Sequence, residues 1–96
     1  MTIENFEKSL READLRGMDL PGMDLTGMNL QGVKMRNSNL RGTDFRDANL
    51  SGADLNGCDL TRVDFRGADL SNADMRGANR FDAKFYGADL RGTKFE

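Results

Sequence analysis

Residues 48–70 read ANLSGADLNGCDLTRVDFRGADL, and a large apolar residue returns there at every fifth position. The same phase extends outward in both directions, from Leu10 to Phe95, and gives 18 units. We call the large residue of each unit its centre: 11 centres are Leu, four are Phe, two are Met and one is Arg80. All 11 glycines also share one phase, two residues after a centre. This period predicts a single repetitive domain over residues 8–96.

A period of five fits neither regular element. Marks five residues apart drift around a straight helix, and they alternate between the two faces of a straight strand. The pattern is satisfied if the chain turns a corner once per unit. The centre and the smaller residue two positions earlier, which is Ala in eight units, then face one enclosed axis. Glycine supplies a positive φ at the corner, and the Asp or Asn before the centre can bond nearby backbone N–H groups.

Three units carry the pattern most clearly: 53–57 (Ala-Asp-Leu-Asn-Gly), 68–72 (Ala-Asp-Leu-Ser-Asn) and 88–92 (Ala-Asp-Leu-Arg-Gly). They resemble the A-(D/N)-L-x-x motif of the pentapeptide-repeat family. The resemblance implies an all-β fold, a right-handed quadrilateral β-helix with four units in each coil. Residues 20 apart would then stack, with Phe45, Phe65 and Phe85 in one column above Leu25. With about 4.5 coils at roughly 4.8 Å each, the rod is about 22 Å long.

The N-terminal residues 1–7 fall outside the register. Ile3, Phe6 and Leu10 follow Thr2 at helical spacing, which predicts a short N-terminal helix or turn that caps the first coil. A frayed terminus is the alternative. No comparable segment follows the last unit, so we expect the C-terminal coil to be exposed.

One unit of the C-terminal coil breaks the pattern, because Arg80 occupies an inward position. An unpaired guanidinium is costly to bury, so we expect Arg80 to reach out through the open end or to pair with Asp82 or Asp59. Phe81 and Tyr86 point outward nearby and predict a homodimer through this coil. Sequence decay in a terminal repeat is the alternative.

The amino-acid composition excludes several kinds of binding and catalysis. The chain has 14 Lys and Arg against 16 Asp and Glu, a net charge of −2, so we expect no direct binding of nucleic acid or anionic membrane. It has no His, and its single cysteine, Cys58, lies at a small inward position, where we expect buried packing. The sequence shows neither an apolar run of about 20 residues nor a signal peptide, which predicts a cytoplasmic protein.

The regular aspartates favour a structural role. Asp14, Asp54 and Asp74 occupy equivalent places, whereas catalytic carboxylates need unlike environments and a calcium site needs converging oxygens. We therefore expect no metal, no cofactor and no enzymatic activity.

The outward charges carry the functional prediction. Eight of ten arginines follow a centre and ten of twelve aspartates precede one, so acidic and basic positions alternate over the faces. We expect a non-enzymatic solenoid scaffold that binds a protein partner. The outward contacts we expect are Arg36, Arg46, Arg66, Arg76, Phe81 and Tyr86.

The alternative function follows from the resemblance. Some members of the family are acidic, dimeric rods that resemble DNA, bind DNA gyrase and protect it from quinolones. A 22 Å rod would need about 13 uncompensated negative charges to imitate duplex DNA. Residues 8–96 hold 14 basic and 14 acidic residues, so DNA mimicry ranks second.

Overall fold

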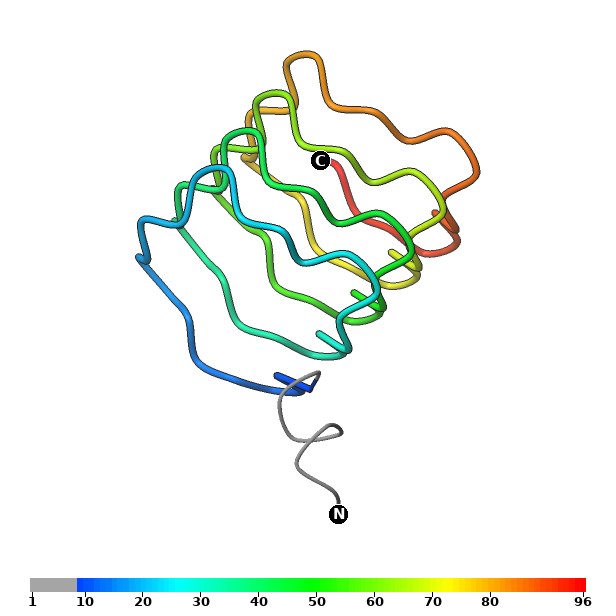
Figure 1. Cartoon of the computed structure of the whole chain (residues 1–96), viewed down its shortest axis with the longest axis horizontal. Helices are drawn as coiled ribbons and strands as arrows, with labels where there is room; N and C mark the ends of the chain where they lie inside the picture. The colour runs from blue at the N-terminus through cyan, green and yellow to red at the C-terminus, as the bar shows by residue number, and fades with distance from the viewer. Residues whose placement is uncertain (1–8) are drawn as a thin grey trace.

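The computed structural model of the chain describes residues 9–96, and the cap predicted over residues 1–7 lies outside them. Within residues 9–96 there is neither a helix nor a continuous strand. Each unit instead contributes one isolated β-bridge followed by a two-residue turn. Figure 1 shows the result as a stack of coils that runs from the blue residues near 10 to the orange and red residues near the C-terminus.

The coils are joined by parallel bridges between residues 20 apart, from Ser9 with Asn29 to Asp74 with Lys94. One coil is therefore 20 residues long and contains four units. The backbone N–H of each centre from Leu10 to Met75 donates to a carbonyl 19 residues later, as Leu30 does to Asn49 at 2.7 Å. The all-β solenoid expected from the sequence is confirmed, together with the stacking of residues 20 apart.

A hydrogen-bonded turn bends the chain after most centres, while the Met18 and Met23 N–H groups after Leu15 and Leu20 donate to the hydroxyls of Ser38 and Thr43. The Val33 N–H donates to the Leu30 carbonyl at 3.0 Å, and other units repeat this bond. The second turn residue has a positive φ, which is +67° at Gly42. A type II turn needs this conformation, and glycine adopts it without strain. Six residues other than glycine adopt it with φ between 58° and 62°: Glu12, Asn37, Asp47, Arg62, Asn72 and Asp82.

The core is a set of columns inside the coils. Phe45 and Phe65 are fully buried, and their rings stack with centroids 5.4 Å apart and planes 6° apart. Phe85 continues the stack at 5.2 Å from Phe65. The predicted column of phenylalanines is therefore confirmed. We call the units centred on Leu25, Phe45, Phe65 and Phe85 the Phe column, and their outer surface the Phe face.

Polar residues at small inward positions are satisfied by the coil before them. Ser38, Thr43 and Thr93 donate their hydroxyl hydrogens to carbonyls 23 residues earlier, at 2.7–2.9 Å. Cys58 makes the same contact with the Met35 carbonyl at 2.8 Å and is 1% exposed, which confirms its predicted packing role. Burial raises the pKa of the Cys58 thiol to about 11, so the thiol stays protonated at neutral pH.

Candidate protein-interaction surface

The outward Asp or Asn of a unit holds the turn that follows it. Asp64 Oδ1 accepts the backbone N–H of Arg66 at 3.0 Å, and Asn79 Oδ1 accepts that of Phe81 at 3.1 Å. These bonds confirm the predicted corner role of the acidic position. They also fix the backbone from which the outward side chains project.

The same carboxylates bind arginine side chains. Arg66 donates from Nε to Asp64 Oδ1 at 2.9 Å and from Nη2 to Asp64 Oδ2 at 2.6 Å. Because a centre points inward between them, the two side chains leave the same face. The hydrogen bond from Arg46 lowers the pKa of Asp44 to about 2 in the equivalent pair. Four other units repeat the contact: Asp14–Arg16, Asp44–Arg46, Asp74–Arg76 and Asp89–Arg91.

Two arginines lack an aspartate in their own unit and bind the next coil. Arg36, in the unit of Lys34, approaches Asp54 at 3.1 Å. Arg41 approaches Asp59 at 3.3 Å in the same way. Sequence reasoning placed these side chains outward but did not pair them. The signal was present in the lack of an aspartate two residues earlier, at Lys34 and Asn39, combined with an aspartate 18 residues later.

The six predicted contact residues do not gather on one face. Arg46, Arg66 and Tyr86 share a corner of successive coils, where they line a shallow hollow of about 330 Å³. Arg36 and Arg76 stand two units away in register, in the column of Met35 and Met75. Phe81 occupies a third corner, one unit before Tyr86.

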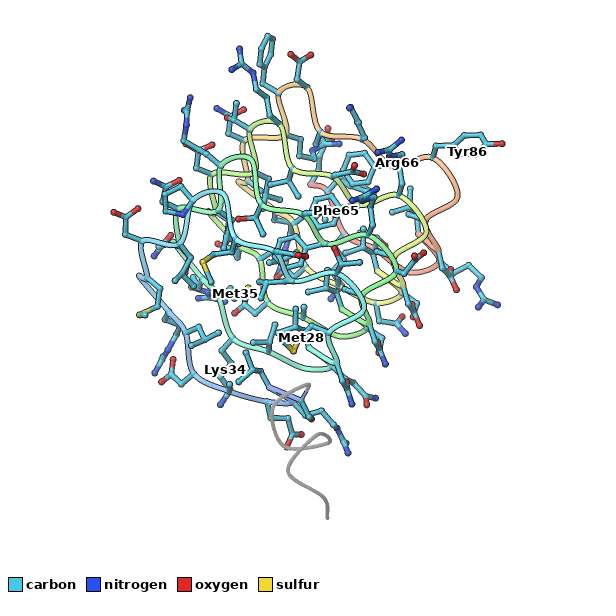
Figure 2. All side chains as sticks on the ribbon, in the orientation of Figure 1. Met28, Lys34, Met35, Phe65, Arg66 and Tyr86 are labelled. Atoms are coloured by element: carbon cyan, nitrogen blue, oxygen red, sulfur yellow. The ribbon has the colours of Figure 1, made fainter. Side chains whose placement is uncertain are left out.

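The predicted contact residues also differ in whether their side chains are already bound within the protein. All four arginines are in ion pairs with aspartates at 2.6–3.1 Å. Phe81 and Tyr86 are 64% and 88% exposed. Tyr86 extends away from the stack beside Arg66 in Figure 2, while Phe65 and Met35 lie inside the coils.

Arg80 is exposed, and its guanidinium lies 4.5 Å from the centre of the Phe95 ring. It therefore reaches out of the coil end, which was one of the two expectations. Within residues 9–96 it has no ion pair: Asp59 binds Arg41 at 3.3 Å, and Asp82 lies 4.0 Å from Arg62. The cation–π contact at an exposed site avoids the free-energy cost of burying an unpaired guanidinium. The homodimer expected through this coil stays a prediction.

The family profile for pentapeptide repeats (8 copies) matches residues 9–47 and 43–79. The chain is a pentapeptide-repeat protein. This pentapeptide-repeat chain matches the crystal structure of alr5209, a pentapeptide repeat protein from Nostoc PCC 7120, with 31% identity and a TM-score of 0.63. That match covers 100% of this chain and 76% of alr5209.

Two further solved structures bear on the comparison. HetL from Nostoc sp. strain PCC 7120, involved in heterocyst differentiation regulation, is 29% identical with a TM-score of 0.73. The match covers 90% of this chain but 44% of HetL, so the chain spans less than half of HetL. QnrB1, a plasmid-mediated fluoroquinolone resistance protein, is 17% identical over 92% of this chain and 54% of its own, with a TM-score of 0.48. That similarity supports no functional inference. None of the curated protein sequences matches this chain.

Among residues 9–96, no three His, Cys, Asp or Glu side chains are grouped to hold a metal ion. In the same residues, no helix is long and apolar enough to cross a membrane. A second shallow hollow, of about 510 Å³, is lined by Arg62, Asp82, Ala83 and Lys84.

Proposed function

We propose that this pentapeptide-repeat chain is a non-enzymatic scaffold that binds a protein partner through its outward side chains. The observation that carries the proposal is the exposure of two aromatic side chains on hydrogen-bonded turns, Phe81 at 64% and Tyr86 at 88%. Aromatic residues are enriched in protein interfaces, where a rigid ring contributes contact area at low entropic cost. Arg66 lies beside Tyr86 and adds polar contacts.

The rigid backbone supports the same role. Each described coil is bonded to the next through the bridges 20 residues apart, so outward groups keep a fixed spacing of about 4.8 Å along the stack. A partner meets a preformed surface and loses little free energy in ordering it. We expect Arg46 to contribute beside Arg66 at the Tyr86 corner, and Arg36 and Arg76 to contribute where the partner extends beyond that corner.

The test is a pulldown from the source cells with tagged protein and quantitative mass spectrometry. The Phe81→Ser, Tyr86→Ser, Arg66→Glu triple variant should lose a partner that the wild type retains. Arg16→Glu is the matched control, because Arg16 also pairs with an aspartate two residues earlier. Circular dichroism checks that each variant is folded. If the triple variant keeps every partner of the wild type, these contacts are wrong.

The second candidate is a modulator of DNA gyrase that mimics DNA, supported by family membership. A mimic needs carboxylates that remain available to a DNA-binding surface. Here Asp44, Asp64 and Asp74 are held by arginines at 2.6–2.8 Å, so scaffold binding ranks first. A gyrase supercoiling assay decides this candidate: inhibition at micromolar protein supports mimicry, and unimpaired supercoiling at higher concentration removes it.

A further inference from the structure

Residues 81–86 cover the part of the Phe face nearest the C-terminus and the corner before it, and we call this surface the Phe81–Tyr86 side. It carries a cation that has no ion pair among the residues that the structure describes. Lys84 projects outward midway between the two aromatic residues and is exposed. It has no ion pair with any residue in 9–96, although it bridges to Asp64 through the backbone. The reason is that the Asp64 carboxylate is bound to Arg66 at 2.6 Å and has Arg46 at 3.8 Å.

A second cation at this side is held only loosely. Arg62 lies 4.0 Å from Asp82, and these side chains are 70% and 63% exposed. An exposed pair at that distance contributes little to stability. The other paired arginines within residues 9–96 reach a carboxylate at 3.3 Å or less. The Arg62 guanidinium is therefore available to an incoming anion.

The backbone at Arg62 points to a role for its side chain. Its φ is +60°, the left-handed conformation that favours glycine. The same corner holds Gly22 and Gly42 in the two earlier coils, and Arg62 and Asp82 in the two later ones. Within residues 9–96, no other corner lacks glycine in two successive coils. Strained residues of this kind cluster at functional sites, and within residues 9–96 the only ion pair of the Arg62 side chain is the 4.0 Å contact with Asp82.

We propose that the Phe81–Tyr86 side, together with Arg62 in the coil beneath it, binds an acidic, partly apolar segment of a partner protein. Carboxylates of that segment contact Arg62 and Lys84 at the hollow these residues line with Asp82 and Ala83. Its apolar side chains pack on the rings of Phe81 and Tyr86. The inference rests on the proposed scaffold function and specifies the chemistry of the partner.

The charge pattern favours a short acidic segment over nucleic acid. A nucleic-acid groove needs a continuous row of cations that follows the phosphates. This side has one unpaired cation, Lys84, and one loosely held cation, Arg62, and the Asp82 carboxylate that lines the same hollow repels a polyanion. In a peptide complex, the same carboxylate accepts a backbone N–H of the bound segment.

Fluorescence anisotropy with defined probes tests the site. The probe is a fluorescein-labelled 12-residue peptide of alternating Glu and Leu, and the controls are a Lys and Leu peptide and a 12-nucleotide single-stranded DNA. The wild type should bind the acidic peptide, with binding weakened by salt. Arg62→Glu with Lys84→Glu should weaken it about tenfold or more, because both ionic contacts become repulsive. No binding by the wild type, or tighter binding of the DNA, overturns the proposal.

A charge-matched variant separates a defined site from net charge. Arg16→Glu with Lys34→Glu changes the formal charge by the same amount at exposed positions outside this side. It should bind the peptide as the wild type does, and equal weakening of both variants overturns the proposal. Arg62→Gly restores the glycine of this corner and removes one cation. It should weaken binding without loss of the circular dichroism signal, and unchanged binding argues against Arg62.

The pulldown distinguishes this inference from the scaffold function beneath it. A partner lost by the Phe81, Tyr86 and Arg66 triple variant but kept by Arg62→Glu with Lys84→Glu overturns the acidic segment and leaves the scaffold standing. A partner lost by both, together with binding of the acidic peptide by the wild type, supports the inference. Sedimentation of the wild type adds one more outcome: a dimer dissociated by Phe81→Ser would make a second copy the occupant and overturn the proposal.

Discussion

Arg66 and Asp64 form a two-pronged ion pair across a single inward residue, with Nε and Nη2 of Arg66 at 2.9 Å and 2.6 Å from the two carboxylate oxygens. The buried residue between them, Phe65, belongs to the stacked core. One unit thus combines a core side chain, a turn and a neutralised charge pair. Acidic and basic groups therefore cancel within the five units that hold such a pair, and the cations that lack a close carboxylate become the informative ones.

The charge pairs predict loss of stability in acid. Arg46 and Arg91 lower the pKa of Asp44 and Asp89 to about 2, below the usual Asp value of about 3.9. A group with a depressed folded-state pKa stabilises the fold above its unfolded pKa and loses that effect as pH falls. The melting temperature should therefore stay level from pH 7 to about 4 and fall between about 4 and 2.

Arg46→Gln tests whether the ion pairs cause that loss. It should lower the melting temperature at pH 7, and the difference from the wild type should shrink as pH falls through about 4 towards 2 and vanish below about pH 2, where Asp44 is protonated in both the folded and the unfolded chain. Arg11→Gln is the control, since Arg11 has no ion pair within residues 9–96. A gap between Arg46→Gln and wild type that persists unchanged at pH 2 would contradict this origin.

The phenylalanine stack predicts unequal costs along one column. Phe65 is 0% exposed and lies between Phe45 and Phe85, so Phe65→Ala leaves a cavity in the middle of the stack. We expect a loss of about 3–5 kcal/mol in urea unfolding followed by circular dichroism. Phe85→Ala should cost less because Phe85 is only partly buried. Equal losses at the two sites would show that the column does not set the stability.

Two glycines with the same backbone conformation predict different tolerance of a side chain. Gly42 and Gly57 have φ values of +67° and +70°. A Cβ at position 42 meets no atom within 4 Å, so Gly42→Ala should cost about 1–2 kcal/mol for the left-handed conformation. A Cβ at position 57 overlaps the Asn37 side chain, so Gly57→Ala should cost more. Asn37→Gly in the Gly57→Ala background should recover the excess, and no recovery would rule out the overlap as its cause.

The inward hydroxyl of Thr43 predicts a polar contribution inside the core. It is 0% exposed, donates to the Leu20 carbonyl at 2.9 Å and lies 3.3 Å from the Met23 nitrogen. Thr43→Val keeps the shape and leaves these backbone groups without the hydroxyl, so we expect a loss of about 1–3 kcal/mol in chemical denaturation. Thr93→Val is the control, because Thr93 makes the same bond but is only partly buried. A larger loss at Thr93 would be the contrary result.

The periodic part of the structure was predictable from the sequence. The position of each centre fixes which side chains face inward, so the column of Phe45, Phe65 and Phe85 followed once the coil had four units. The role of the acidic position at the corner followed from the ability of Asp and Asn to bond nearby amides. These features are local or repeat with the period, and long-range packing does not change them.

The candidate surface was less predictable because charge partners depend on local substitutions. Arg36 binds Asp54 in the next coil because position 34 is Lys instead of Asp. Arg62 and Lys84 stand out only after the partners of the other cations are known. Arg80 likewise needed the placement of Phe95, which lies in a neighbouring column and offers its ring to the guanidinium.

Because each coil holds four units, the direction in which outward side chains point can change while the buried centres stay largely the same. Loss of one five-residue unit from the middle of the chain sets every later residue back by a quarter of a coil. Tyr86 would then stand in the register that Phe81 now occupies. The centres along the axis would still be leucine, phenylalanine or methionine almost throughout. Short in-frame deletions can therefore change which outward residues share a face while the hydrophobic core stays nearly unchanged.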